Sequence, residues 1–277
     1  MATSVTKYRG GSVIIPGRNK SNIPFYKEKQ KIWFGADKTE STDKGVELFI
    51  DYQNPAISYP TKATNPSFYR LFSIAKVNGL NVANAAPESI TNIASAYTIP
   101  NLAEFGNQSC ITFAFLAKSD AVAYPKGQRS LFFVGATGAS FVPMIRIQFN
   151  SNTSFTVYSR HSDPDEIASS VTMNNIPAGY NFITVEMNYA QNTLGVRVNG
   201  GIPLRVPAYT GKSGNNSMPE NAIGALFSYL TSAGGVDNGS QFSGQLWGMS
   251  VFMGQLSDLE LKSVTDFYLD RRARLSL

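Results

Sequence analysis

The sequence predicts an all-β fold: a two-sheet antiparallel β-sandwich with an extended N-terminal arm and one short C-terminal α-helix. Three observations lead to this prediction. Apolar and polar residues alternate over many short segments, which is typical of strands with one buried face. Clusters of glycine, proline, asparagine and serine separate these segments at short intervals, as turns do. Of the 277 residues, 43% are hydrophobic and only 16% are charged, a balance that suits a β-sheet core.

The first 45 residues are expected to form an arm outside the sandwich. Residues 1–40 hold eight of the 24 lysines and arginines but three of the 19 acidic residues, so this segment carries a charge of +5. The remaining 16 basic and 16 acidic residues cancel. A basic arm on a neutral body indicates an anionic partner surface, although a solvated leader has the same composition. The residues expected to anchor the arm are Lys7, Arg9, Arg18, Lys20, Phe25, Tyr26 and Trp33.

Residues 46–277 are expected to form one domain. Short strands are predicted at 47–52 and 68–77, whereas residues 78–109 show no sustained period and are expected to be mainly loop. The Asn199-Gly200 pair predicts a tight turn, because both residues tolerate positive φ. The other predicted strands occupy residues 110–118, 129–135, 142–150, 153–160, 182–189, 193–198, 223–230 and 242–253.

The predicted C-terminal helix has its start signal in place. Ser257 can cap the helix, and Glu260 three residues later completes a capping box between Leu256 and Leu261, which have the spacing of a hydrophobic staple. Trp247 lies in the apolar run before the helix and is expected to be buried. The helix has an apolar face and a basic C-terminal end, formed by Leu261, Val264 and Tyr268 and by Arg271, Arg272 and Arg274.

The polar positions of the alternating strands provide the candidate ligand site. If these strands are neighbours, their outward side chains form one polar sheet face. Guanidinium, amide and phenol groups suit sugar hydroxyls and carboxylates, and three arginines against one glutamate favour an anionic glycan. An ordinary solvated face of a half-buried sheet has the same pattern. The residues concerned are Arg146, Gln148, Thr156, Tyr158, Arg160, Thr184, Glu186, Asn188 and Arg197.

No cofactor is expected. The loop at 161–169 contains Asp163, Asp165 and Glu166, whose oxygens suit Ca²⁺, but their spacing matches no EF-hand loop and a solvated turn is the better explanation. Cys110 lies in an apolar run and is expected to be a buried, inert thiol. The sole histidine, His161, lies far along the sequence in a polar loop, so neither a Cys–His nor a Ser–His–Asp site is predicted. No signal segment and no apolar run of membrane-spanning length is found.

Two segments carry a family resemblance. Residues 180–204 (YNFITVEMNYAQNTLGVRVNGGIPL) read as strand, polar turn, strand and Asn-Gly turn, and residues 242–272 as a core strand that leads into a helix. With CITFAFLAK at 110–118, they resemble the concanavalin A-like lectin/glucanase and laminin-G-like jelly rolls over roughly residues 108–272. The resemblance implies a jelly-roll sandwich, and its motifs describe architecture rather than chemistry.

The catalytic branch of that superfamily carries alternating acids of the Glu-x-Asp-x-Glu kind, and this chain has no such strand. Its nearest segment, VEMNY at 185–189, offers the single acid Glu186. Retaining glycosidases need two carboxyl groups about 5 Å apart. The chain is therefore not expected to be an enzyme.

The resemblance and the arm together predict a non-catalytic structural protein of a bacteriophage virion, on the capsid surface or the tail. The arm is expected to anchor it to other virion proteins and to copies of itself, with no nucleic-acid partner. The expected location is the virion, after synthesis in the host cytoplasm. The alternative function is a carbohydrate-binding module that recognises glycans on the host surface.

Overall fold

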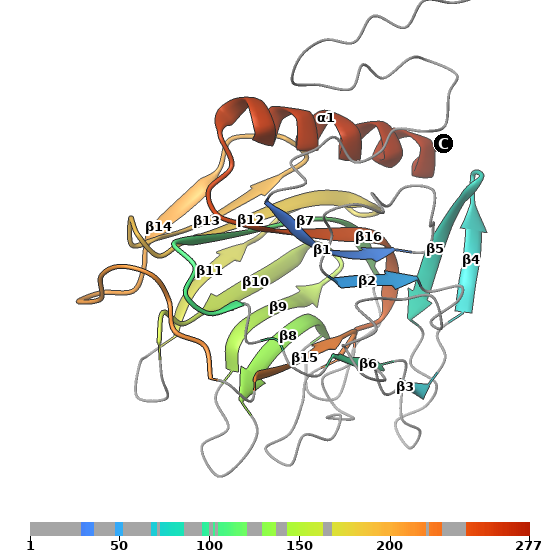
Figure 1. Cartoon of the computed structure of the whole chain (residues 1–277). Coiled ribbons are helices and arrows are strands. Elements are labelled where there is room, and N and C mark those ends of the chain that lie inside the picture. Colours follow the sequence, from blue (N-terminus) through green and yellow to red (C-terminus); the bar gives the residue numbers. More distant parts are fainter. Residues whose placement is uncertain are drawn as a thin grey trace, which may run out of the picture.

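The computed structural model describes residues 29–35, 48–51, 68–70, 73–85, 96–99, 102, 105–120, 129–136, 143–162, 168–219, 222–228 and 242–277; for 30–35, 48–51, 68–70, 73–74, 96–99 and 136 it describes the backbone alone. Two stacked β-sheets form the body, and helix α1 (Asp258–Leu275) covers one of them from outside (Figure 1). The predicted β-sandwich with a C-terminal helix is confirmed. The arm residues Lys7, Arg9, Arg18, Lys20, Phe25 and Tyr26 lie outside the described residues.

The first sheet contains nine of the described strands. They are β1 (Gln30–Gly35), β2 (Leu48–Asp51), β4 (Ser73–Val77), β5 (Leu80–Ala85), β7 (Cys110–Ser119), β12 (Asn181–Asn188), β13 (Thr193–Val198), β14 (Leu204–Pro207) and β16 (Gly244–Met253). Their order is β14-β13-β12-β7-β16-β1-β2, and β5 pairs with both β16 and β4. Among the described pairings, only β1 with β2 is parallel.

The second sheet contains seven of the described strands, all paired antiparallel. They are β3 (Phe68–Arg70), β6 (Ala96–Ile99), β8 (Arg129–Ala136), β9 (Pro143–Ser151), β10 (Ser154–Ser159), β11 (Ser169–Met173) and β15 (Ala222–Leu226). Their order is β11-β10-β9-β8-β15-β6-β3. Consecutive strands from β8 to β11 are neighbours, as short turns between antiparallel strands favour.

The alternating residues meet in one core between the two sheets. Val185 of β12 lies opposite Phe113 of β7 and Val196 of β13, and all three are buried. Ile145 and Ile147 of β9 enter the same core from the second sheet. Each such side chain contributes roughly 1.5–3 kcal/mol when fully buried. The period-2 assignment of these strands is therefore confirmed.

A second, smaller core lies between the outer face of the first sheet and α1. The ring of Tyr268 stacks on Phe182 of β12 at 4.9 Å, and its hydroxyl lies 2.8 Å from Ser250 Oγ of β16. Trp247 meets the Tyr268 ring edge-on at 5.6 Å and is buried, as expected. The outer face of the first sheet is therefore apolar where α1 packs on its middle strands.

The predicted capping box is confirmed. Ser257 Oγ accepts a hydrogen bond from the backbone N–H of Glu260, and the Glu260 carboxylate accepts one from the backbone N–H of Ser257. Arg271 differs from expectation, because it is buried and its guanidinium lies 4.1 Å from the centre of the Phe267 ring. Within the described residues, no helical segment combines the length and hydropathy that a bilayer crossing requires.

The sandwich takes in residues that were expected outside it. Trp33 was assigned to the arm, but it lies in β1, opposite Ser250 of β16, so the boundary expected at residue 45 is wrong for this strand. The long strand β16 leaves backbone groups unpaired beyond β5, and β1 satisfies them. The expected loop at 78–109 contains β5 and β6, and the expected strand at 68–77 divides into β3 and β4, one in each sheet.

Candidate functional site

The outward residues predicted from the sequence do not form one face. Those of β9 and β10 belong to the second sheet, and those of β12 and β13 belong to the first. The polar side chains that alternate with the core therefore lie on opposite outer sides of the sandwich. The expectation of a single polar face is wrong because alternation assigns a residue to one side of its own sheet but does not say which sheet holds the strand. The divided set is Arg146, Gln148, Thr156, Tyr158 and Arg160 on the second sheet and Thr184, Glu186, Asn188 and Arg197 on the first.

On the second sheet, the polar groups hydrogen-bond to one another. Gln148 Nε2 donates to Asn150 Oδ1 at 3.0 Å, and Asn150 Nδ2 donates to Thr156 Oγ1 at 2.8 Å. Thr156 Oγ1 also lies 2.9 Å from Thr172 Oγ1 of the edge strand β11. Gln148 and Thr156 are each only 4% exposed. These groups join neighbouring strands, so they are poor candidates for ligand contacts.

Arg146 and Tyr158 form a cross-strand pair on the same outer face, and Arg160 follows directly after β10. All three are half-buried. Arg160 donates its backbone N–H to the carbonyl of Met144 at 2.9 Å, which fixes the chain at the end of β10. None of these three side chains lines the pocket found on the first sheet.

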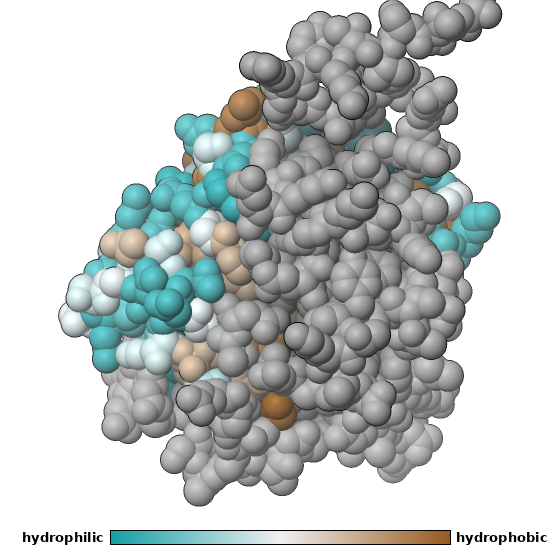
Figure 2. Space-filling model, viewed as in Figure 1, coloured by the Kyte–Doolittle hydropathy of each residue, from teal (hydrophilic) through white to brown (hydrophobic). Residues whose placement is uncertain are grey.

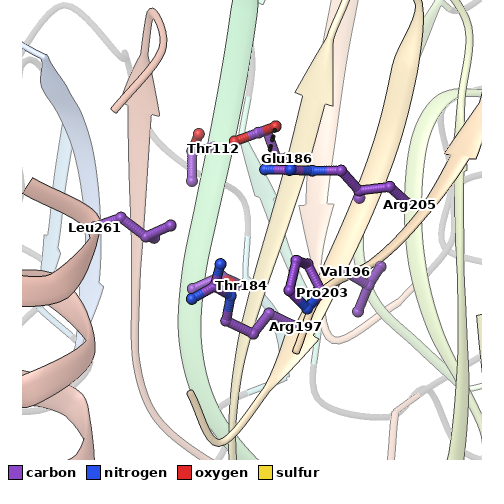
Figure 3. A pocket seen from close by; sticks show the side chains of 9 residues that line it. Thr112, Thr184, Glu186, Val196, Arg197, Pro203, Arg205 and Leu261 are labelled. Atoms are coloured by element: carbon purple, nitrogen blue, oxygen red, sulfur yellow. Dashed lines mark ion pairs between the residues drawn. The ribbon is translucent and has the colours of Figure 1, made fainter. Parts of the chain in front are cut away.

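On the first sheet, an open pocket lies between the strands and the start of α1 (Figure 3). The space between its walls measures about 290 Å³, open solvent included. The predicted residues Thr184, Glu186 and Arg197 all line it. The complete lining is Thr112, Thr184, Glu186, Gly195, Val196, Arg197, Pro203, Arg205 and Leu261.

Asn188, the fourth predicted residue on this sheet, is not part of the pocket. It is buried, its Oδ1 accepts the backbone N–H of Gln191 at 3.0 Å, and its Nδ2 donates to Gln191 Oε1 at 3.2 Å. These bonds fix the turn between β12 and β13. Asn188 therefore has a structural role, and its prediction as a ligand residue is not supported by its position.

Arg205 was not predicted, and it contributes the second cation of the pocket. Gly195 of β13 lies between Arg205 of β14 and Glu186 of β12 in the register of the sheet. Because Gly195 has no side chain, Arg205 can lie across β13 and reach Glu186, with Nη2 3.5 Å from Oε1 (Figure 3). A Cβ atom on Gly195 would come within 3.2 Å of Arg205 Cγ. The Arg205 side chain is 53% exposed, so this ion pair contributes at most about 1 kcal/mol.

Arg197 is a cation without a counter-ion within the described part of the chain. It lies opposite Thr184 in the pairing of β12 and β13, and Figure 3 shows its guanidinium beside that threonine. The side chain is half-buried. Glu186 is engaged by Arg205, and no ion pair joins Glu186 to Arg197. The pocket therefore carries one uncompensated positive charge over a floor of two threonine hydroxyls.

Two apolar residues complete the walls of the pocket. Pro203 comes from the loop before β14, and Leu261 reaches the pocket from the second turn of α1. Ile202, next to Pro203, is 93% exposed. Elsewhere the described surface seen in Figure 2 is predominantly hydrophilic, with hydrophobic residues near the end of α1 that lies opposite the C-terminus.

The pocket lacks the usual groups for acid–base catalysis or metal binding. Glu186 is its one carboxylate, whereas glycoside hydrolysis uses two. Within the described residues, no three His, Cys, Asp or Glu side chains gather as metal ligands. The Ca²⁺ candidates Asp163, Asp165 and Glu166 lie outside the described residues.

Cys110 is buried, as predicted. Burial, and to a lesser extent the negative charge of Glu186, raises the pKa of its thiol to about 12, so the reactive thiolate is suppressed at neutral pH. His161 was expected in a polar loop but is 5% exposed. Its Nε2 lies 3.3 Å from the carbonyl of Gly214, and its ring meets Tyr189 edge-on at 5.7 Å. Packing against aromatic rings therefore buries it in the body.

No family model matches the sequence, and no curated protein matches it. Solved structures do match its fold. The binding domain of botulinum neurotoxin serotype D/C (VPI 5993) superposes with a TM-score of 0.55 at 8% identity, covering 87% of this chain and 52% of that one. A structure of botulinum neurotoxin type C, whose cell entry depends on two ganglioside molecules, gives 0.51 at 8% identity, with 87% and 52% covered. The CBM40 module of a Ruminococcus gnavus sialidase, bound to α2,3-sialyllactose, gives 0.46 at 14% identity, with 66% and 97% covered.

This chain spans about half the length of the toxin chains that it matches. At such identities the likeness concerns the fold alone. It agrees with the lectin-like β-sandwich expected from the sequence, and the finer assignment to the concanavalin A-like superfamily stays a prediction. The chain shares its architecture with the binding domain of botulinum neurotoxin serotype D/C.

Proposed function

We propose that this chain is a non-catalytic glycan-binding module and that its site is the pocket of the first sheet. The carrying observation is the composition of that pocket: two threonine hydroxyls, a Glu186–Arg205 ion pair, the uncompensated Arg197, and the apolar Pro203 and Leu261. Sugars present hydroxyl groups around their edge and C–H groups on their faces. A floor of hydrogen-bonding groups beside an apolar wall complements both.

The position of the pocket supports this role. Its polar residues stand on the paired strands β7, β12, β13 and β14, so the backbone holds them in place without a ligand. Sites built on strands keep their geometry better than sites on loops, and a preformed site loses less entropy when it binds. The smaller loss of entropy matters most for a sugar bound in a shallow site, because such a sugar makes few contacts.

The structural neighbours support the proposal by analogy. Several are binding domains of toxins, and the cell entry of botulinum neurotoxin type C depends on gangliosides, which are glycan-bearing lipids. A common fold does not transfer a binding site, and the identities to the D/C and C toxins are only 8%. The proposal therefore depends on the residues of the pocket, and the analogy adds that a sandwich of this kind is a suitable frame for glycan recognition.

The experiment is a glycan array probed with the full chain, followed by titration of each retained glycan. Changing Arg197→Ala or Glu186→Ala should abolish retention. Tyr158→Phe, on the other sheet, and Lys212→Gln, which removes an exposed positive charge from a turn, should leave it unchanged. Absence of any retained glycan, or retention that the pocket variants do not alter, refutes the proposal.

The non-catalytic part has its own measurement. Polysaccharides and oligosaccharides incubated with the chain should yield no new reducing ends. If new reducing ends appear, and the variant Glu186→Gln no longer produces them, the chain is instead an enzyme with a single carboxylate at its active site. A binding protein and an enzyme are separated by this result, whichever glycan is retained.

The virion location remains a prediction from the family resemblance and the arm, as do the virion partners and self-association. None of the structural neighbours described above is a virion protein. The structure alters the experiment that tests the arm, because residues 30–35 are a strand of the sheet and Lys29 is paired with Glu260. Deletion should therefore end at residue 28. The truncated chain should keep its melting temperature and lose assembly, and normal assembly would contradict the arm hypothesis.

A further inference from the structure

We infer that the pocket of the first sheet takes a sugar residue that carries a carboxylate, and that Arg197 binds this carboxylate; the inference rests on the proposed glycan-binding function. It narrows the ligand from glycans in general to singly charged acidic sugars, such as uronic or sialic acids. Four features of the pocket lead to it: its charge, the position of Arg197, its apolar walls, and the placement of Glu186.

The charges of the pocket leave one cation for a ligand. Arg205 and Arg197 are its two positive groups, and Glu186 is its one negative group. Arg205 already contacts Glu186 at 3.5 Å, whereas Arg197 has no counter-ion among the described residues. A half-buried guanidinium forms stronger hydrogen bonds with an anion than with a neutral hydroxyl. The net charge of the site therefore favours a ligand with one negative group.

The position of Arg197 suits a planar anion. Its guanidinium lies beside Thr184, the residue opposite it on β12. A guanidinium presents two parallel N–H groups that match the two oxygens of a carboxylate. Thr184 places a hydroxyl at the same level of the pocket, where it can bond a neighbouring ring hydroxyl or the carboxylate itself. This pair of groups recognises an acid attached directly to a polyhydroxylated ring.

The walls of the pocket suit such a ring. The Arg205 side chain fills the space above Gly195, so a ring would lie beside it, next to the guanidinium of Arg197. Pro203 on one side and Leu261 on the other offer surfaces for the C–H groups of the ring. Leu261 belongs to α1, so the helix supplies one wall of the site in addition to covering the sheet.

Glu186 limits the charge of the ligand. Its carboxylate lies on the floor, two residues along β12 from Thr184, and the Glu186 side chain is only 17% exposed. A second anionic group on the ligand would approach this carboxylate and be repelled. Polysulfated chains and nucleic acids carry many closely spaced anions, so they should bind less well than a sugar with a single carboxylate.

The test compares matched ligands by calorimetric titration of the full chain. The pairs are 3′-sialyllactose and a glucuronic-acid disaccharide, each with its carboxyl-reduced counterpart. At least one carboxylate sugar should bind about tenfold more tightly than its neutral partner, the usual advantage of one charge-assisted contact. Raising the salt concentration should reduce this difference, because the contact is partly exposed.

The variants assign the effect to Arg197. Arg197→Gln should remove the preference for the acid, and Arg197→Lys should restore only part of it, because lysine keeps the charge but lacks the planar pair of donors. Lys212→Gln, which changes the net charge equally, should leave the preference intact. Far-ultraviolet circular dichroism of each variant shows whether it is folded.

Each outcome separates this inference from the function that it rests on. Equal binding of acid and neutral sugars, lost in Glu186→Ala, overturns the carboxylate assignment and leaves the glycan-binding function in place. A sulfated lactose that binds as tightly as the carboxylate sugar also overturns it, since the site would then recognise any anion. Failure of every sugar to bind removes both proposals.

Discussion

Arg205 reaches Glu186 across an intervening strand, and the two side chains meet 3.5 Å apart above Gly195. The glycine is the reason that a residue of the edge strand β14 can contact a residue of the more central strand β12. Glu186 is thereby paired with Arg205, and no ion pair joins it to Arg197. The contact therefore sets which arginine remains available to a ligand.

Replacing Gly195 with alanine should weaken ligand binding without unfolding the protein. The new methyl group would lie 3.2 Å from Arg205 Cγ, so the arginine must shift by a few tenths of an ångström, which disturbs its alignment with Glu186. Glycine inside a strand is itself unfavourable by roughly 0.5–1 kcal/mol relative to alanine. The unfolding free energy should therefore stay the same or rise slightly, while affinity for the retained glycan falls several-fold. Urea unfolding and calorimetric titration of the same variant measure the two effects.

A large loss of stability together with the loss of binding would show that Gly195 is needed for the sheet rather than for the pocket. The variant Arg205→Gln provides the comparison. It removes the crossing side chain but leaves the glycine, so it should reproduce the change in binding with no change in the unfolding transition beyond about 1 kcal/mol.

Gly244, at the first position of β16, should not tolerate any side chain. Its φ is +147°, and a Cβ atom there would lie 2.0 Å from the Lys118 carbonyl oxygen and 2.8 Å from the Phe242 ring. Gly244→Ala must therefore displace backbone where β16 pairs with β7. The expected loss of stability is at least about 3 kcal/mol, the upper end of the usual cost of overpacking a core, because backbone atoms must move.

Gly211→Ala is the matched control for this prediction. Gly211 also has a positive φ, +76°, but no atom lies within 4 Å of the position that an added methyl group would take. Its cost should be about 1 kcal/mol, from backbone strain alone. Thermal unfolding of both variants tests the contrast, and similar losses for the two would mean that the contacts of Gly244 do not matter.

Stability should fall in acid as the Glu260 carboxylate is protonated. Burial opposes its ionisation, but hydrogen bonds from Lys29 and from Ser257 outweigh this and hold the pKa of Glu260 below its usual value. Since the folded pKa is the lower one, the stabilising effect is complete above the unfolded pKa and is lost as pH falls through the folded pKa. Urea midpoints measured from neutral pH down to about pH 3 should show this loss.

Glu260→Gln should be less stable than the natural chain at neutral pH and should show a shallower acid dependence. The Lys262–Asp266 pair, exposed on the same helix, serves as the comparison. Asp266→Asn should have little effect at any pH, because such exposed pairs contribute only about 0.3–0.5 kcal/mol. An unchanged acid dependence in Glu260→Gln would assign the effect to other carboxylates.

Cys110 should be unreactive until the protein unfolds. Burial raises the pKa of its thiol to about 12, so a thiol reagent at mildly alkaline pH meets almost no thiolate and no open path. The raised folded pKa also means that this group stabilises the fold below the unfolded pKa and ceases to do so as pH rises through the folded one. Labelling with iodoacetamide, followed by mass spectrometry over a urea series, should track the unfolding transition. Rapid labelling without urea would contradict the burial.

Much of the sandwich could be predicted because its strands carry strict alternation. Val185 and Ile145 are core residues, as their positions in the pattern require, and the capping residues Ser257 and Glu260 mark the helix start. Strand alternation and helix capping are local features, so they can be predicted from residues that are neighbours in the sequence. Trp33 was misassigned because β1 has few residues and its partner β16 lies at the far end of the sequence.

The pocket was only half predicted, for a reason that lies in the turn before β14. The turn itself is present, with the N–H of Gly201 bonded to the carbonyl of Val198. A two-residue turn would place Val196 opposite Pro203, but Val196 pairs with Leu204. This shift of one residue moves every side chain of β14 to the other face. Arg205 reaches the pocket only because of this one-residue shift in register, and no local sequence pattern indicates the shift.

Strand β16 has consequences for how the chain is made. It pairs with β7 along its length and shares its other edge between β5 and β1, yet its residues come late in the sequence. During synthesis on the ribosome, the edge of β7 stays unpaired until β16 has been made, when most of the chain has already emerged. Contacts between such distant segments form slowly, and an unpaired apolar edge attracts other chains. Translation that stops before residue 244 should therefore yield an aggregating product rather than a smaller folded domain.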